Sequence, residues 1–246
     1  MMLHVIASGS TGNAYVLQSE KEALVIEAGV HIQDVLTVLD FNSKKVVGCI
    51  CTHEHGDHFR YIEDYLKYFP CYCSKGTIDS KENWKHPRKP IALELFKTIK
   101  LGGFCIRAFD TEHDAKEPIG FLIEHEETGK ILFVTDSYFV KYQFDGLNII
   151  MLECNYDLQI LQENCQKGII PKKLEERTLE SHMSLEHCKQ MLRATDLTDV
   201  SRIILLHLSK NNADPIRFKE EIELLTGKYV HIAQRGLELP INVIPF

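Results

Sequence analysis

The sequence predicts a mixed α/β fold that forms a single domain over residues 1–246. Short apolar runs separated by Gly-containing turns predict strands, and other segments with apolar residues at a spacing near 3.6 predict helices. The two kinds of segment do not alternate regularly, which disfavours a doubly wound sheet. No repeat, low-complexity block or Pro/Gly/Ser-rich linker divides the sequence into parts.

The first third of the chain begins with strands. Apolar runs predict them at residues 3–7, 14–17 and 23–27. Residues 30–39 carry apolar side chains at helical spacing, and they lead into a buried strand at 46–51. A second helix is predicted at 61–68, where Pro70 stops it.

The middle of the chain is rich in strands and the last third is mixed. Apolar runs predict strands at 104–109, 119–125, 130–135 and 147–152. They are followed by a helix at 184–194, an apolar run at 202–206, an amphipathic helix at 214–225 and a short strand at 229–233. Residues 166–177 are the least structured long segment by pattern. Their mixed charges are typical of a solvated face, and a basic loop facing a substrate is the alternative.

Composition places the chain among water-soluble globular proteins. Hydrophobic residues make up 44% of it and charged residues 26%, which excludes disordered and fibrous classes. The sequence has neither an apolar run of membrane-spanning length nor a signal-peptide pattern at its start, so we expect a cytoplasmic protein that does not bind membranes. The net charge is −7, from 28 Lys and Arg against 35 Asp and Glu. A nucleic-acid partner would therefore need a local basic patch or bound metal.

Eight cysteines are expected to be reduced thiols. Cys49 and Cys51, like Cys71 and Cys73, are two positions apart, whereas zinc ribbons use a C-x-x-C spacing that this chain lacks. The pattern therefore disfavours a thiolate metal site.

The most informative segment is Thr52-His53-Glu54-His55-Gly56-Asp57-His58, directly after the strand predicted at 46–51. His53 and His55 are two apart, so both can point the same way and chelate one ion. Asp57 and His58 follow a glycine at which the backbone can turn, so they can face a second ion. Imidazole and carboxylate ligands suit zinc and also manganese or iron. The alternative is a solvated loop without bound metal.

Two ions need more ligands than one loop supplies, and three later apolar runs end in suitable side chains. His113, Asp136 and His207 follow the runs at 104–109, 131–134 and 203–206. Each candidate therefore stands at the carboxyl end of a predicted strand, where functional side chains often gather. A pair of ions about 3.5 to 4 Å apart can bind a water and a phosphoryl group together.

This pattern resembles the metallo-β-lactamase superfamily, whose fold is a four-layer αββα sandwich of the α+β/α/β type with a dinuclear metal centre. The resemblance spans nearly the whole chain. It implies that one metal is held by His53, His55 and His113, that the other is held by Asp57, His58 and His207, and that Asp136 bridges the two.

Two further acidic residues, Asp114 and Glu27, bear on this ligand set. Asp114 could replace its neighbour His113 as a ligand, which would leave His113 as a helper. Glu27 stands where the family usually has an Asp at the end of a strand. Its longer side chain can still accept hydrogen bonds from the metal-binding loop.

Other segments are similar to the YycJ/WalJ-like branch of the superfamily. They are the small-residue segment 8–13 and the segments 153–157, 181–184 and 207–212. That branch is associated with cytoplasmic nucleases of the 5′ to 3′ DNA exonuclease type. The residues expected to contact substrate are Ser10, Asn13, Asn155 and Lys210.

Glu153 and His182 also resemble a Glu and a His that the tRNase Z group uses for proton transfer. We expect His182 to be the general acid and Glu153 to orient it, with Asp57 serving both as ligand and in catalysis. The structural alternative for His182 is a loop residue preceding the helix cap Ser184.

The leading hypothesis is a hydrolase that cleaves DNA phosphodiesters from an end, with two Zn²⁺ or Mn²⁺ ions and a metal-bound hydroxide as nucleophile. One alternative is a small-molecule hydrolase acting on a thioester or a cyclic phosphodiester, and another is a non-catalytic binding module stabilised by metal. A single strand could stack on Trp84 among the cations Lys81, Lys85, Arg88 and Lys89. The same stretch could instead be a solvated connector with a packed Trp.

Overall fold

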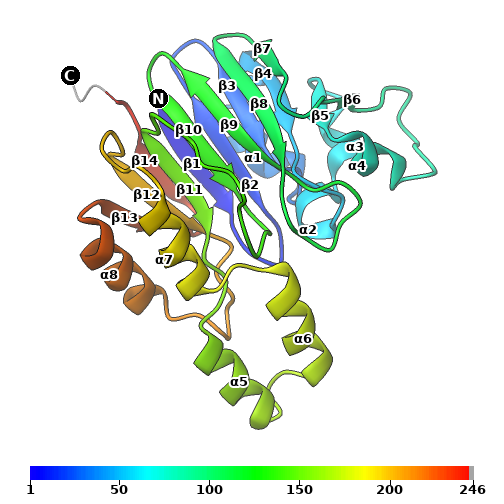
Figure 1. The fold of residues 1–246 in the computed structure, drawn as a ribbon. Helices are drawn as coiled ribbons and strands as arrows, with labels where there is room; N and C mark the ends of the chain where they lie inside the picture. Colours follow the sequence, from blue (N-terminus) through cyan, green and yellow to red (C-terminus); the bar gives the residue numbers. More distant parts are fainter. Residues whose placement is uncertain (244–246) are drawn as a thin grey trace.

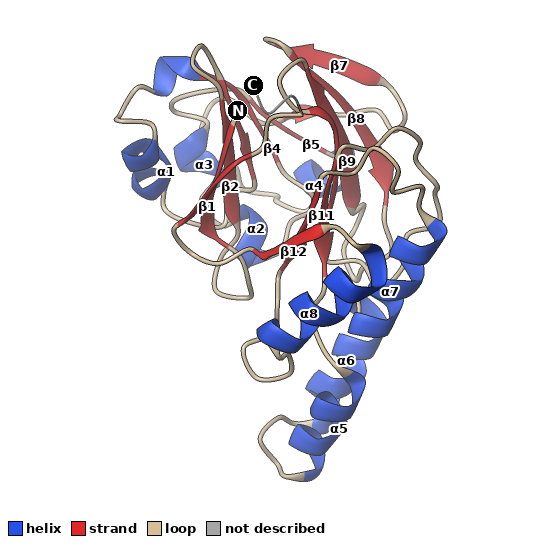
Figure 2. Ribbon diagram, turned by 90° about the vertical axis from the view of Figure 1, so that its left-hand side faces the viewer, coloured by secondary structure: helices blue, strands red, loops and turns tan. Residues whose placement is uncertain are grey.

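Two seven-stranded sheets lie face to face, with helices on their outer sides (Figures 1 and 2). The computed structural model describes residues 1–243, so the predicted domain of 1–246 includes three residues outside the described part. The first sheet has the strand order β14-β1-β2-β3-β4-β5-β6 and the second β13-β12-β11-β10-β9-β8-β7.

The first sheet begins with antiparallel strands and continues with parallel ones. Its strands are β1 (Met2–Ala7), β2 (Ala14–Gln18), β3 (Ala23–Ile26), β4 (Val46–Ile50), β5 (Cys71–Cys73), β6 (Ile91–Ala92) and β14 (Leu237–Pro240). Strands β14, β1, β2 and β3 are antiparallel neighbours, and β3 through β6 are parallel. Strands β5, β6 and β14 are too short or too exposed to give an apolar pattern, and the sequence did not predict them.

The second sheet is antiparallel at one side and parallel at the other. Its strands are β7 (Thr98–Leu101), β8 (Phe104–Asp110), β9 (Ile119–His125), β10 (Gly129–Val134), β11 (Ile149–Glu153), β12 (Arg202–Leu206) and β13 (Tyr229–Ile232). Strands β10 to β13 are parallel, so their carboxyl ends share one edge of the sheet. Apart from the exposed β7, all of these strands are confirmed predictions.

Side chains alternate between two apolar layers along the strands. In β10, Ile131 and Phe133 point into the space between the sheets, whereas Leu132 and Val134 point to the helices outside. In β3, Leu24 and Val25 divide in the same way. Burial on both faces explains why these strands read as continuous apolar runs in the sequence.

The helices complete four layers. Those on the first sheet's side are α1 (Ile32–Val38), α2 (Gly56–Phe59), α3 (Ile62–Tyr65) and α4 (Lys75–Asp79), with a 3-10 turn at Ser43–Lys45. The others are α5 (Leu158–Gln166), α6 (Lys172–Ser181), α7 (Leu185–Ala194) and α8 (Pro215–Thr226). The buried faces of α7 and α8 pack on the second sheet, and those of α1 and α3 on the first. The molecule is therefore the αββα sandwich that the resemblance implied.

Local capping explains where the two best-predicted helices begin. Ser184 accepts a hydrogen bond from the backbone N–H of His187 at the start of α7, and Asp214 accepts one from Arg217 at the start of α8. Helix α8 ends at Gly227, whose φ of 66° favours glycine. The helices predicted at 184–194 and 214–225 are confirmed.

Two predictions about helices were wrong. The helix predicted at 61–68 is confined to the single-turn helix α3 at Ile62–Tyr65, and the sequence did not predict the separate turn α2 at Gly56–Phe59. The segment 166–177, predicted as the least structured, contains the end of α5 and the first half of α6. Leu161 of α5 and Ile170, which precedes α6, pack with Tyr156, a contact between segments that sequence periodicity does not show. Figures 1 and 2 place α5 and α6 beyond one edge of the sheets.

The cysteines are free, and Cys49, Cys51, Cys71 and Cys73 pack together in the core beneath α1 and α3. Burial raises the pKa of Cys51 to about 11, so its thiol stays protonated. Among the described residues, no helix is both long and apolar enough to cross a membrane.

Candidate metal centre

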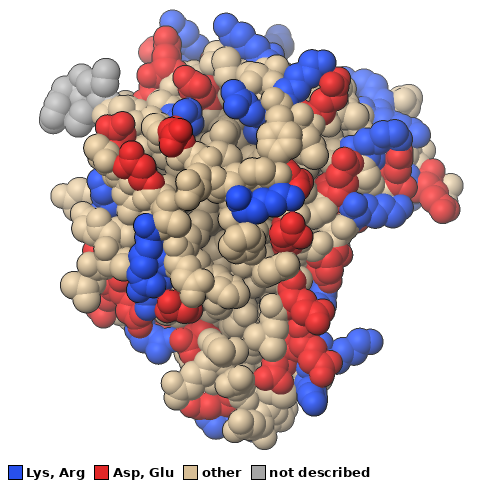
Figure 3. All heavy atoms as spheres, in the orientation of Figure 1, with Lys and Arg blue, Asp and Glu red and all other residues tan. Residues whose placement is uncertain are grey.

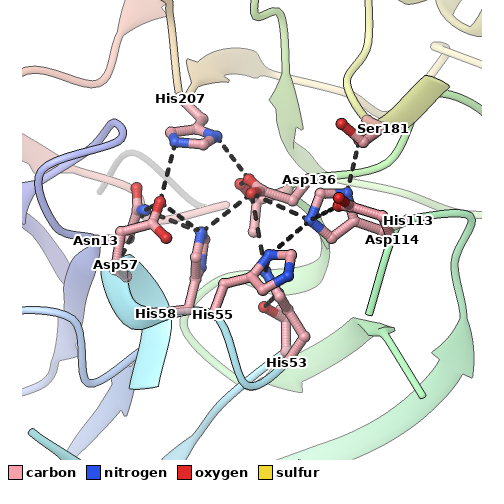
Figure 4. A network of polar contacts seen from close by, with 12 residues as sticks. Asn13, His53, His55, Asp57, His58, His113, Asp114, Asp136, Ser181 and His207 are labelled. Carbon is pink, nitrogen blue, oxygen red and sulfur yellow. Dashed lines mark hydrogen bonds and ion pairs between the residues drawn. The ribbon is translucent and has the colours of Figure 1, made fainter. Parts of the chain in front are cut away.

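The candidate ligands gather where strands of both sheets end. The loop 52–58 follows β4, and His113, Asp136 and His207 follow β8, β10 and β12. Because β10 and β12 belong to one parallel set, their carboxyl ends bring Asp136 and His207 to the same edge. The 52–58 loop comes from the first sheet and the other donors come from the second. The cluster therefore lies at the edge where strands of both sheets end (Figure 4).

Backbone strain marks the same edge. Asp136, His207 and Glu27 have φ values of 46°, 53° and 69°, a region that residues other than glycine seldom adopt. Each follows a strand end closely, so the unusual conformation turns the chain sharply there. Such strain persists where the surroundings impose it, and it occurs often at functional sites.

One group of donors brings together three imidazoles and a carboxylate. His55 Nδ1 lies 3.0 Å from His53 Nε2 and 3.0 Å from His113 Nε2. Asp136 Oδ2 lies 3.8 Å from His53 Nε2 and 3.7 Å from His113 Nε2. One atom from each of these four residues lies within 4.8 Å of the others, the spacing of atoms around a single cation.

A second group combines two imidazoles with two carboxylates. Asp57 Oδ2 lies 3.4 Å from His58 Nε2 and 3.5 Å from His207 Nε2. Asp136 Oδ2 lies 3.3 Å from His58 Nε2, and the Oδ1 atom of the same carboxylate lies 2.6 Å from His207 Nδ1. Asp136 therefore belongs to both groups and stands between them (Figure 4).

Hydrogen bonds behind the first group orient its imidazoles. His53 Nδ1 donates to Thr52 Oγ1 over 2.9 Å, and the same hydroxyl donates to Glu27 over 2.6 Å. His113 Nδ1 donates to the carbonyl oxygen of Ser181 over 2.7 Å. With Nδ1 protonated, Nε2 of each ring keeps its lone pair facing the group, which is the form that binds metal. As expected, the longer side chain of Glu27 still reaches the metal-binding loop.

Amide side chains brace the second group. Asn13 is fully buried, and its Nδ2 lies 3.0 Å from His58 Nε2 and 3.3 Å from the carbonyl oxygen of Asp57. Asn155 Nδ2 donates to the carbonyl oxygen of His207 over 2.7 Å, and Ser8 Oγ accepts from the backbone N–H of His207 over 2.9 Å. Asn13, which was predicted to contact substrate, is therefore buried behind His58 and Asp57 and is not among the residues that line the cavity.

The centre is electrostatically prepared for cations. Burial lowers the pKa of His53, and the charge of His58 adds to the effect. Burial also opposes the charged form of His58 and His207, but the carboxylate of Asp136 raises the pKa of both above the ordinary histidine value. The pKa of Asp57 is lowered despite its burial, because the imidazoles of His207 and His58 lie close to its carboxylate and favour the charged form. Buried carboxylates thus attract positive charge, whether protons or metal ions.

The donor set fits divalent metal ions. In the described part of the chain, both ring nitrogens of His207 and Nδ1 of His58 are buried without a hydrogen-bond partner. His207 Nδ1 is close to a carboxylate oxygen of Asp136, but its N–H direction is not aligned with that oxygen. The two atoms therefore do not form a hydrogen bond. Buried polar atoms without partners are costly, and a bound cation would satisfy one ring nitrogen of His207. His58 Nδ1 faces Glu27, whereas its Nε2 faces Asp57 and Asp136. Imidazole and carboxylate donors suit zinc and manganese alike.

A hydrogen-bonded dyad lies beside the second group. His182 Nδ1 is 2.6 Å from Glu153 Oε1, and the other carboxylate oxygen accepts the backbone N–H groups of Ser137 and Met183. Burial opposes charge on His182, yet the carboxylate of Glu153 raises the pKa of the imidazole. Glu153 and His182 also lie within 4.8 Å of ligand atoms of Asp136 and His207. The dyad therefore lies directly beside the candidate centre.

A cavity of about 460 Å³ opens onto these groups. Three of the four predicted substrate contacts line it, namely Ser10, Asn155 and Lys210. Helix α6 contributes Leu174, Arg177 and Thr178 to its wall. The mixed charges of 166–177 predicted a solvated face or a substrate-facing loop and no helix, although the spacing of Ile170, Leu174 and Thr178 by four residues is a helical signal.

The basic stretch around Trp84 is a packed connector. The Trp84 ring meets Phe59 edge-on with 6.2 Å between ring centroids, and it joins the apolar cluster beneath α1 and α3. Lys81 pairs with Glu63 at 2.7 Å. Because the indole packs inward, the solvated-connector interpretation describes this stretch better than a stacking platform.

The fold and the paired His/Asp groups define a metallo-β-lactamase-fold hydrolase with a candidate metal site. The chain belongs to this superfamily, since residues 32–208 match the Beta-lactamase superfamily domain. It is 27% identical over 224 residues to Exodeoxyribonuclease WalJ of Streptococcus pneumoniae, covering 85% of this chain and 81% of that protein. It is 26% identical over 228 residues to Exodeoxyribonuclease YycJ of Bacillus anthracis, covering 86% and 84% respectively.

The fold is similar to that of the metallo-beta-lactamase fold protein YhfI from Bacillus subtilis. The two structures superimpose with a TM-score of 0.72 at 16% sequence identity. The alignment covers 97% of this chain and 98% of YhfI. At this level of identity the likeness concerns the fold alone.

Proposed function

We propose that this protein is a DNA exonuclease that hydrolyses phosphodiesters with two divalent cations. The observation that carries the proposal is the pair of four-donor groups sharing Asp136, with the His182–Glu153 dyad beside them in one cavity. The relatives from Streptococcus pneumoniae and Bacillus anthracis are exodeoxyribonucleases by name, which supports DNA as the substrate. The 5′ to 3′ direction follows the resemblance to the YycJ/WalJ-like branch.

In this proposal one cation is held by His53, His55 and His113, the other by Asp57, His58 and His207, and Asp136 bridges them. When bound, Zn²⁺ or Mn²⁺ would lower the pKa of water and neutralise phosphate charge. Asp114 lies 3.3 Å from His113 Nε2, but it also pairs with Arg177. His113 Nε2 lies 3.0 Å from His55 Nδ1 and belongs to the four-donor group, which favours His113 over Asp114 as the ligand.

The chain's own residues supply proton transfer. His182 lines the cavity and is held through Nδ1 by Glu153, which leaves Nε2 to donate a proton to the departing oxygen. Glu153 is a positioning residue, because it acts through the imidazole. Asp57 also lines the cavity and remains ionised, so its carboxylate can accept a hydrogen bond from the attacking water.

Substrate contacts come from the cavity rim. Lys210 is exposed there and can pair with a phosphate, while Ser10 can donate a hydrogen bond. Asn155 contributes mainly by holding the carbonyl of His207. These groups recognise a phosphodiester backbone and do not read base sequence.

The test is a product ladder. Protein reconstituted with Zn²⁺ or Mn²⁺ is incubated with single- and double-stranded DNA and RNA, each labelled at either the 5′ or the 3′ end. We expect stepwise shortening of DNA from its 5′ end, abolished by a chelator and by Asp136→Ala. Purely internal cleavage, or no cleavage of DNA by metal-loaded protein, would overturn the proposal. Preferential turnover of a thioester or a cyclic phosphodiester would support the small-molecule alternative.

A further inference from the structure

One wall of the cavity has no part in the proposed bond cleavage, namely the inward side of α6. Leu174, Arg177, Thr178 and Ser181 follow one another at the spacing that places residues on one helix face. Thr178 and Ser181 are buried, whereas Leu174 and Arg177 are exposed in the cavity. Thr178 and Ser181 attach this face to the protein. Leu174 and Arg177 present an apolar group and a cation to the molecule that occupies the cavity.

The C-terminal end of α6 is attached directly to the candidate centre. Ser181 accepts the hydrogen bond of His113 through its carbonyl oxygen, and the next residue, His182, bonds to Glu153. At about 1.5 Å rise per residue, Arg177 lies about 6 Å and Leu174 about 10 Å along the helix axis from Ser181. Both side chains are therefore within reach of a nucleotide adjoining a phosphodiester at the metal ions.

Arg177 is available to a phosphate. Its ion pair with Asp114, 2.7 Å between Nε and Oδ2, joins side chains that are 53% and 42% exposed. Exposed pairs of this kind contribute little, so a substrate phosphate can compete for the guanidinium. Arg groups also bind phosphate through two parallel hydrogen bonds, which gives orientation as well as affinity.

The charge of the surrounding surface does not attract a polyanion, so binding one requires cations at the cavity itself. On the face shown in Figure 3, basic and acidic side chains are interspersed, and acidic residues follow one edge of the α5–α6 end of the molecule. The chain as a whole carries a charge of −7. A polyanion is therefore attracted by individual cations at the cavity, Arg177 from α6 and Lys210 from the 207–212 loop.

We propose, on the basis of the function proposed above, that α6 forms a subsite for the nucleotide next to the scissile phosphodiester. Arg177 binds the phosphate of that nucleotide and Leu174 contacts its base or sugar. The subsite makes the substrate a polynucleotide, because a small phosphodiester has no group that would reach either residue. It contributes no base-specific hydrogen bond, so it accepts any sequence.

The experiment compares two substrates of the metal-loaded protein. One is an end-labelled single-stranded oligonucleotide, and the other is bis-p-nitrophenyl phosphate, which lacks a neighbouring nucleotide. Arg177→Ala is expected to lower kcat/KM for the oligonucleotide about 10- to 100-fold, mainly through KM, with a loss at least tenfold smaller for the small diester. Leu174→Ser is expected to raise KM for the oligonucleotide about fivefold. Arg177→Lys should recover part of the loss, because it restores the charge.

Two controls separate this role from a structural one. Lys173→Ala removes an exposed cation of the same helix outside the cavity lining, and oligonucleotide kinetics should not change. Asp114→Asn breaks the ion pair but keeps Arg177. If Arg177 acted only by holding the loop of His113, Asp114→Asn would lower oligonucleotide turnover as much as Arg177→Ala does, and this result would overturn the subsite.

Equal losses of Arg177→Ala on both substrates would also refute the subsite while leaving the exonuclease proposal intact. If the wild-type protein cleaved neither substrate, the proposed function itself would fail. Turnover of the small diester alone would likewise refute the exonuclease, and the subsite with it.

Discussion

Nδ1 of His182 lies 2.6 Å from Oε1 of Glu153, and Glu153 is completely buried at the end of β11. A buried carboxylate holding a partly exposed imidazole at the edge of a cavity resembles the base-and-orienter pairs of many hydrolases. The Glu153 carboxylate is itself fixed by the backbone N–H groups of Ser137 and Met183. The direction of the imidazole is thus determined by three separate segments of the chain.

The first prediction concerns the dependence of activity on pH. The pKa of His182 is raised above its ordinary value, so the imidazole keeps its proton to a higher pH than an unperturbed histidine does. With His182 as general acid, kcat should fall as the pH rises through this pKa, above about 6.5. Glu153→Gln removes the charge that raises the pKa, so the fall should move to lower pH.

His182→Ala should lower kcat about 100-fold or more and abolish this alkaline limb. The measurements are kcat profiles at saturating metal, with bound metal quantified by elemental analysis. An unchanged limb in His182→Ala would show that another group is the acid.

The second prediction concerns competition between metal and protons. Asp136 raises the pKa of His58 and His207 despite their burial, so in the metal-free protein both bind protons up to a pH above 6.5. A metal ion must displace these protons. The apparent affinity for Zn²⁺ should therefore increase as the pH rises through the raised pKa values, and binding should release protons.

Calorimetry in buffers of different ionisation enthalpy measures that proton release. His207→Gln should release fewer protons than the wild type. An affinity independent of pH between 6 and 8 would contradict the prediction.

The third prediction concerns Glu27, which supports the metal-binding loop through Thr52 and lies 3.4 Å from His58 Nδ1. Glu27→Ala should weaken metal binding about 10- to 100-fold, because the hydroxyl that orients His53 loses its acceptor. Glu27→Gln keeps an acceptor oxygen and should lose less. Competition with a chromophoric chelator measures both, and equal affinities of Glu27→Ala and the wild type would show that the loop is held by other contacts.

The fourth prediction concerns stability away from the centre. Asp214→Ala removes the cap of α8 and should lower the free energy of unfolding by about 1 kcal/mol. Urea unfolding measures this change, with Glu220→Ala at an exposed position of the same helix as control. Catalytic activity should not change, because α8 lies apart from the cavity lining.

The candidate centre was unusually accessible to sequence analysis for a physical reason. Strands buried on both faces appear as continuous apolar runs, so the polar residues at their ends, such as His113, Asp136 and His207, stand out. The structure brings these residues and the 52–58 loop together as two groups around Asp136. Asn13 was expected among the substrate contacts, but a sequence cannot show whether a polar side chain faces a cavity or lies behind it.

The sequence by itself predicted a mixed α/β fold and the donors available at the strand ends, because apolar runs and closely spaced ligands are local properties of the chain. The αββα architecture was expected only from the resemblance that the ligand motif carries. Only the tertiary structure decided what surrounds those donors. Helix α6 is mostly polar, so no local apolar run predicts it from the sequence. It follows Ile170, which packs against Tyr156 and Leu161. Arg177 and Leu174 line the cavity on a helix that is attached through its buried residues Thr178 and Ser181, and such contacts between distant segments depend on how the layers assemble.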